Sequence, residues 1–223
     1  MNFYTQQRES LLNKGLKMSQ FFYVHPDNPQ GRLIKQAVAM VDDGAVIVYP
    51  TDSGYALGCH MGDKKALERI CKIRDIDKNH NFTLVCSDLS QISEYTRIDN
   101  VAYRLLKKNT PGAYTFIFKG SKEVPKRLLN PKKKTIGIRI PDNVIAQSLL
   151  TELKEPLMST SLILPGEQNA ECDPEHIRDI LEHSVDLIIN GGYLGEKPTT
   201  VIDFSEDSVD IIRVGEGDPL PFV

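Results

Sequence analysis

Short apolar strands alternate with amphipathic helical segments along the chain, and this alternation limits the fold more than any other feature. Apolar residues recur at helical spacing over residues 31–43, where Gly44 ends the pattern, and the apolar strand AVIVYP follows at 45–50. A second helical pattern over 64–75 precedes the short strand TLVC at 83–86. Strands that are covered by helices in this way are typical of α/β and α+β domains.

The alternation breaks in the second half of the chain, where strands follow one another directly. Two strands are predicted at 114–119 and 135–141, and three more at 185–190, 199–204 and 209–214. Strands without a helix between them pair antiparallel, so we predict an α/β (α+β) fold with a twisted, mixed parallel and antiparallel sheet flanked by helices. The remaining predicted elements are a strand at 157–161 and helices at about 99–108, about 143–153 and from the capping pair Asp173 and Pro174 to about 183.

The chain is long and apolar enough to bury one full core. It has 223 residues, of which 40% are hydrophobic, so we expect a single domain over residues 18–223. Residues 1–17 are polar and lack periodicity, and we expect a disordered N-terminal extension there. No apolar run reaches the roughly 18 residues that a membrane span needs, and the N-terminus lacks the apolar stretch of a secretory signal. We therefore expect a cytoplasmic protein without a membrane partner.

Cysteine spacing and short motifs exclude several common chemistries. The four cysteines form no CxxC pair and the five histidines do not reach metal-ligand spacing, so we expect neither a disulfide framework nor a protein-bound metal. The P-loop, the dinucleotide-binding fingerprint, HExxH and GxSxG are all absent. Cys59 and His60 are adjacent in sequence, and neighbours rarely face each other, so a nucleophilic dyad is disfavoured.

Positive charge is concentrated in one segment of an otherwise acidic chain. Residues 104–139 hold 11 basic residues and one acidic residue, whereas the whole chain has a net charge of -3. This segment could hold the phosphates of a nucleotide or of RNA, or it could be ordinary solvated surface. Its aromatic residues Tyr114, Phe116 and Phe118 alternate along a strand, which fits a core better than a base-stacking platform.

Hydroxyl groups and cations gather at the predicted ends of strands and helices. Ligands bind at the ends of strands in open α/β sheets, and such groups can bind phosphate or carboxylate oxygens. Singly, each has an ordinary structural explanation, because threonine is common in strands and cations are common at helix ends. These residues are Thr51, Asp52, Ser53, Lys72, Arg74, Thr110, Thr115, Arg139, Ser159, Thr160, Ser161, Thr199, Thr200 and Arg213.

Taken in order and with their spacing, seven segments resemble the YrdC/YciO family, and most closely its YciO branch. The resemblance extends over residues 19–217. The segments that resemble the YciO branch in particular are PTDSGYALG, HNFTLVC, STSLILPG and KPTTVID. The seven segments are YPTDSGYALG (49–58), KIR (72–74), TPGAYT (110–115), IGIRIP (136–141), STS (159–161), PTTVID (198–203) and IRVG (212–215).

The resemblance implies a large, concave, basic cavity and, for the YrdC branch, synthesis of L-threonylcarbamoyladenylate from ATP, L-threonine and bicarbonate for tRNA modification. Mg²⁺ would accompany ATP as the only cofactor. No side chain would act as a nucleophile, and catalysis would rest on positioning and electrostatics, with Lys72 and Arg74 the most important residues. By matching position, the nucleotide-binding residues would be Lys72, Arg74, Asn81, Thr115, Ser161 and Arg213, and the threonine-binding residues Thr51, Arg139 and Thr199.

Two positions depart from the family pattern. The S-x-N motif reads Ser161-Leu162-Ile163, and Cys86 stands where some synthases carry a histidine. Loss of one hydrogen-bonding group in a buried site costs about 1–3 kcal/mol. The sequence therefore leaves open a synthase that is weak or uses another amino acid, a protein that binds double-stranded RNA or tRNA through residues 104–139, and a nucleotide-binding protein without this activity.

Overall fold

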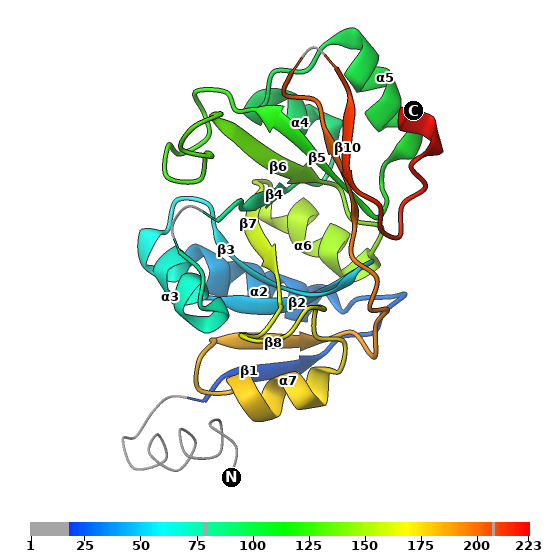
Figure 1. Cartoon of the computed structure of the whole chain (residues 1–223). Coiled ribbons are helices and arrows are strands. Elements are labelled where there is room, and N and C mark those ends of the chain that lie inside the picture. Colours follow the sequence, from blue (N-terminus) through cyan, green and yellow to red (C-terminus); the bar gives the residue numbers. More distant parts are fainter. Residues whose placement is uncertain (1–17, 78–79, 207) are drawn as a thin grey trace.

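The computed structural model describes residues 18–77, 80–206 and 208–223 (Figure 1). The extension predicted at residues 1–17 lies outside these residues. No helix in the described ranges combines the length and the apolar composition that crossing a bilayer requires.

All ten strands of the described chain join one sheet, which confirms the predicted mixed pairing. The order across the sheet is β1-β8-β2-β3-β7-β4-β6-β5-β9-β10, with β1 and β8 at one end and β9 and β10 at the other (Figure 1). Four neighbouring pairs are parallel and five are antiparallel, and β5 pairs antiparallel with β6, as expected for strands joined without a helix. Their bounds are β1 Gln20–Tyr23, β2 Ile47–Thr51, β3 Gly54–His60, β4 Thr83–Val85, β5 Tyr114–Lys119, β6 Thr135–Arg139, β7 Leu157–Ser161, β8 Leu187–Asn190, β9 Thr200–Asp203 and β10 Asp210–Arg213.

Six α-helices pack on the two faces of the sheet in the described chain. Asp63, Asp99, Asn143 and Asp173 accept hydrogen bonds from backbone N–H groups of the first turns of four of them, which fixes where these helices begin. The predicted Asp173–Pro174 helix start is confirmed. The helices are α2 Gly31–Asp42, α3 Lys64–Arg74, α4 Leu89–Tyr95, α5 Asn100–Asn109, α6 Val144–Leu153 and α7 Pro174–Leu181, followed by a 3-10 turn at Leu220–Phe222.

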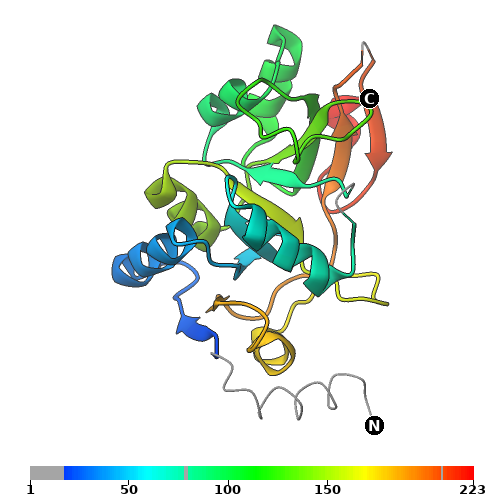
Figure 2. The same ribbon diagram turned by 90° about the vertical axis from the view of Figure 1, so that its left-hand side faces the viewer.

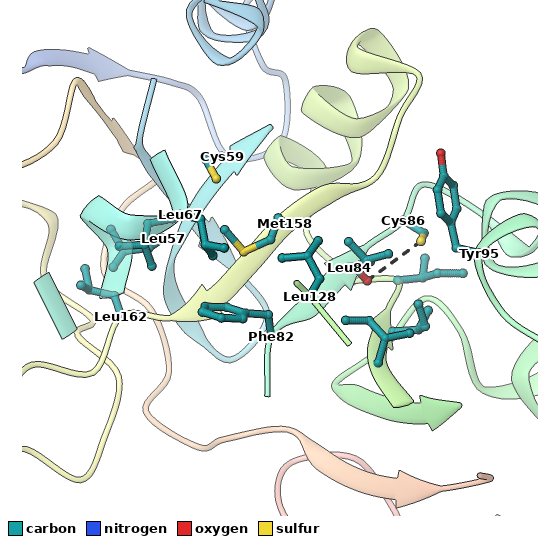
Figure 3. Packing of buried hydrophobic residues seen from close by; sticks show 14 of the residues in the cluster. Leu57, Cys59, Leu67, Phe82, Leu84, Cys86, Tyr95, Leu128, Met158 and Leu162 are labelled. Carbon is teal, nitrogen blue, oxygen red and sulfur yellow. Dashed lines mark hydrogen bonds between the residues drawn. The ribbon is translucent and has the colours of Figure 1, made fainter. Parts of the chain in front are cut away.

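Each face of the sheet carries its own apolar cluster. The larger cluster joins α3, α4, α5 and α7 to one face and includes Phe82, Leu84, Met158 and Leu162 (Figure 3). The smaller cluster joins α2 and α6, which lie side by side, to the other face (Figure 2). The predicted core role of Tyr114, Phe116 and Phe118 is confirmed, because all three are buried in the larger cluster.

The smaller cluster covers only the first part of its face. Its last member toward β10 is Val85 on β4. Beyond that point β6 and β5 carry Gly137, Arg139, Thr115 and Ile117 on this face, while their alternate residues enter the larger core. This part of the face, beyond the smaller cluster, carries two of the expected site residues, Thr115 and Arg139.

Candidate functional site

The first group of expected residues lies at the end of β7, beside the last turn of α3. Asp75, with a left-handed φ of 50°, ends α3 and leaves Lys72 and Arg74 in its last turn. The Arg74 guanidinium donates from Nη1 to Thr160 Oγ1 at 2.6 Å and from Nε to the Ile163 carbonyl at 3.1 Å. Burial lowers the pKa of Arg74, which the structure shows as half-buried. Arg74 is thus held at a defined place at the strand end.

Three other expected residues lie close to this strand end with exposed side chains. Lys72 is exposed in the turn that holds Arg74, and Ser161 is exposed as the last residue of β7. Asn81 and Ser161 each lie two residues beyond the Thr83–Ser159 pair of the β4–β7 register. Asn81 Oδ1 also accepts a 3.0 Å hydrogen bond from Nδ2 of Asn130, in the lysine-rich loop.

His80 joins this group, although it was not among the residues expected at the site. Its Nε2 lies 3.3 Å from Thr160 Oγ1, the same hydroxyl that binds Arg74. Burial lowers the pKa of His80, and the nearby Arg74 cation lowers it further. The only signal in the sequence was its position at the start of HNFTLVC.

The second group brings together Thr115, Thr199 and Arg213, which are far apart in the chain. Thr115 Oγ1 and Thr199 Oγ1 are 2.9 Å apart, and Arg213 Nη2 donates to Thr199 Oγ1 at 3.1 Å. Arg213 Nε and Nη2 also donate to the Thr199 carbonyl at 3.0 and 2.9 Å. Thr115 was expected to bind the nucleotide and Thr199 to bind threonine, but the two residues belong to one hydrogen-bonded cluster.

Arg139 forms the buried charge beside this cluster. Its side chain is 8% exposed and pairs with the carboxylate of Asp52, which also accepts a hydrogen bond from the Asp142 backbone N–H at 2.9 Å. Burial lowers the pKa of Arg139 to about 10, and the neighbouring Arg213 cation contributes to this shift. Arg139 Nε is buried without a hydrogen-bond partner among the described residues. Such a donor suits an anionic ligand, because an unpaired buried group is otherwise costly.

Thr51 lies in the same turn as Asp52 but turns its hydroxyl group inward. Thr51 is buried, donates to the Gly54 carbonyl at 2.6 Å and accepts from the Ser53 N–H at 3.2 Å. These bonds give the expected threonine-binding residue a structural task in the β2–β3 turn. Gly54, with φ of 95°, permits that turn.

Gly137 of β6 lies between Thr83 of β4 and Thr115 of β5. A Cβ atom at this position would lie 2.8 Å from Thr83 Oγ1, 3.3 Å from the Phe82 carbonyl oxygen and 3.4 Å from Thr115 Cγ2. Thr83 and the backbone of Phe82 therefore crowd this position, and the glycine lets β4, β6 and β5 pack closely there.

We expect Gly137→Ala to lower the free energy of unfolding by about 1–3 kcal/mol, because the new methyl group overpacks the gap beside Thr83. Chemical denaturation would measure the change. Thr83→Ala removes the closest contacting atom, so the double variant should recover part of the loss. Unchanged stability in Gly137→Ala would contradict the close packing around this glycine.

The lysine-rich loop between β5 and β6 is tied to the body of the protein at several points. Val124 and Leu128 are buried in the larger cluster, and Arg127 Nη2 donates to the carbonyls of Met61 and Gly62 at 2.9 and 2.6 Å. Lys133 Nζ lies 3.9 Å from the Asp203 carboxylate. Several cations of the 104–139 segment thus have partners within the protein.

The four cysteines are free thiols, three of them buried and Cys71 half-buried. Burial raises the pKa of Cys59 to about 12, and its neighbour His60 faces Glu155 at 3.1 Å. Cys86 lies in the core with its thiol directed at the Leu84 carbonyl (Figure 3), and burial raises its pKa. A thiolate nucleophile at either position is therefore disfavoured.

Two surface pockets lie away from the expected residues. One, of about 460 Å³, is lined by α2 and α6 and includes Asn143 and Gln147. The other, of about 520 Å³, lies between α5 and the β9–β10 connection and includes Val101 and Phe204. Neither pocket contains a residue of the two groups, so they do not bear on the site described above.

Comparisons with known proteins identify the family of this chain. Residues 39–215 match the model of the Sua5/YciO/YrdC family, whose description reads "Telomere recombination". The YciO protein of Escherichia coli K12 is 65% identical over 206 residues, which cover 92% of this chain and 100% of that protein. A threonylcarbamoyl-AMP synthase of Bos taurus is 31% identical over 190 residues, covering 82% of this chain and 67% of the synthase.

Solved structures give the same result for the fold. The crystal structure of E. coli YciO matches with a TM-score of 0.89 at 64% identity, over 92% of this chain and 100% of that one. The crystal structure of P. abyssi Sua5 complexed with L-threonine has a TM-score of 0.81 at 23% identity, over 88% of this chain and 58% of that one. At that identity the second match shows a shared fold alone. The chain therefore belongs to the Sua5/YciO/YrdC family, and it is more similar to YciO than to the synthases compared.

Proposed function

We propose that this protein is an adenylate-forming enzyme of the threonylcarbamoyl-AMP synthase type, which joins ATP, bicarbonate and an amino acid, with L-threonine the first candidate. The observation that carries the proposal is the cluster of Thr115, Thr199 and Arg213 beside Arg139, whose Nε is buried without a partner among the described residues. A relative named threonylcarbamoyl-AMP synthase, 31% identical, supports the reaction type.

The residues of the site would bind the two larger substrates of such a reaction, ATP and the amino acid. Lys72, Arg74 and Arg213 would balance the negative charge of the triphosphate, with Asn81, Thr115 and Ser161 as polar neighbours of the nucleotide. Arg139 would bind the carboxylate of the amino acid, with Thr51 and Thr199 nearby. Mg²⁺ would enter with ATP and neutralise charge on the departing pyrophosphate.

The reaction needs no covalent bond to the protein. The amine of the amino acid condenses with bicarbonate, releasing water, and forms a carbamate. A carbamate oxygen then attacks the α-phosphorus of ATP, the bond from this phosphorus to the bridging oxygen breaks, and pyrophosphate leaves with that electron pair. The protein contributes by positioning the reactants and stabilising charge, which is consistent with buried cysteines and tethered arginines at the site.

The test is pyrophosphate release by the purified protein with ATP, Mg²⁺ and bicarbonate across the twenty amino acids. We expect release that depends on threonine and falls by about a hundredfold or more in Lys72→Ala, because one charge that stabilises the transition state is lost. Lys64→Ala is the matched control, since Lys64 is exposed at the other end of α3 and pairs with Glu68.

Other results would change the proposal in defined ways. Release with a different amino acid would keep the reaction type and replace the substrate. Equal release by Lys72→Ala and the wild type would overturn the assignment of Lys72. No release with any amino acid would overturn the enzyme proposal, and salt-dependent binding of double-stranded RNA or tRNA by residues 104–139 would then be tested instead.

A further inference from the structure

A chain of hydrogen bonds links Arg74 to His80 through one hydroxyl group. A guanidinium can only donate, so Thr160 Oγ1 accepts from Arg74 Nη1 at 2.6 Å. The Thr160 hydroxyl proton is then available for His80 Nε2, which lies 3.3 Å away. Thr160 itself is only 7% exposed, so water competes little for these bonds.

His80 is arranged to accept this proton as a neutral ring. Burial lowers its pKa and the Arg74 cation lowers it further, while Asp77 has the opposite, smaller effect. The ring also meets Phe82 edge-on, with centroids 5.3 Å apart and planes at 74°. Phe82 is buried in the core, so it gives the ring a rigid neighbour.

These hydrogen bonds matter because residue 163, which also contacts Arg74, is an isoleucine. Ile163 cannot hydrogen-bond through its side chain, and only its backbone carbonyl receives Arg74 Nε. The Thr160 hydroxyl is the second acceptor for the Arg74 guanidinium, and His80 in turn orients that hydroxyl. Without His80, the hydroxyl would be free to rotate and to offer its proton elsewhere.

We infer that His80 is a positioning residue, which holds Arg74 in the nucleotide site through the Thr160 hydroxyl. This inference rests on the proposed function, because it assumes that Arg74 binds ATP. It adds a residue that lies outside the KIR and STS segments, which carried the family resemblance. His80 need not touch the nucleotide itself.

The experiment measures ATP affinity by calorimetry for the wild type and for His80→Phe, His80→Gln, Thr160→Val and the His80→Phe/Thr160→Val double variant. We expect about tenfold weaker binding in His80→Phe and in Thr160→Val, as for the loss of one hydrogen bond to a charged group. Glutamine retains an acceptor, so His80→Gln should stay within about threefold of the wild type. The double variant should also bind ATP about tenfold more weakly than the wild type and no more weakly than that, because both changes break the same series of hydrogen bonds.

Two controls separate this inference from fold damage and from failure of the proposed function. His60→Phe alters a histidine at the opposite end of β3 from the Ala56–Ser161 pair and should leave ATP affinity unchanged. Thermal unfolding identifies any variant that loses its fold. If His80→Phe does not fold, the ATP affinity of His80→Gln is compared with that of the wild type instead. No ATP binding by the wild type would overturn the proposed function, and the inference with it. Wild-type binding that His80→Phe leaves unchanged, or fully additive losses in the double variant, would overturn the inference alone.

Discussion

Arg139→Met is expected to lower the free energy of unfolding by about 3–5 kcal/mol, because it leaves a buried carboxylate without its partner. Arg139 and Asp52 are 8% and 12% exposed in their side chains, so water cannot replace the lost guanidinium. The pair also joins the β2–β3 turn to the end of β6, two segments that are 87 residues apart. Urea denaturation at neutral pH would measure the loss.

The charge of Asp52 provides the control for this prediction. Adding Asp52→Asn to Arg139→Met removes the unpaired charge but keeps an oxygen that can accept from the Asp142 N–H, so most of the stability should return. Arg69→Met is a matched comparison, because the Arg69–Asp186 pair is 38% and 25% exposed and should cost less. Equal losses in Arg139→Met and Arg69→Met would contradict the importance of burial at Arg139.

The periodic elements of the fold could be predicted because their patterns are local. Asp99 and Asp173 cap helices where the sequence placed helix starts, and alternation along β5 placed Phe116 in the core. Strand β3 was not predicted although Tyr55, Leu57 and Cys59 alternate along it, because the small residues that alternate with them, at 54, 56 and 58, are poor strand formers. Strand β1 and helix α4 were also missed, since four and seven residues carry little periodic signal.

The candidate site depended on strand order, which local patterns do not contain. Thr115 and Thr199 are 84 residues apart and meet because β9 pairs with β5 in parallel, far from its neighbour in sequence, β8. Residue types alone suggested hydroxyls and cations at strand ends, and the family resemblance selected among them. His80 was missed because its partner Thr160 is 80 residues away and its role depends on that contact.

Arg213→Met is expected to reduce pyrophosphate release by about a hundredfold to a thousandfold, as for the loss of one preorganised donor to developing charge. Arg213 lies on the edge strand β10, and an irregularity between Ile211 and Arg213 shifts the register with β9. Such a shift redirects side chains, and here Arg213 reaches Thr199 with both Nε and Nη2. The side chain is partly exposed, so the variant should remain folded and the loss should appear in kcat/KM.

The shape of the guanidinium gives this prediction its sharpest control. Arg213→Lys keeps the positive charge but cannot hold the Thr199 carbonyl from two nitrogens, so its activity should fall between those of the wild type and Arg213→Met. Arg178→Met removes an arginine over Phe21 at the opposite end of the sheet and should leave pyrophosphate release unchanged. If Arg213→Lys is as active as the wild type, then charge alone acts at this position and the contact with Thr199 contributes nothing. If Arg213→Met is also fully active, then the cluster of Thr115, Thr199 and Arg213 does not bind the reacting phosphates, and the proposed function loses the observation on which it rests.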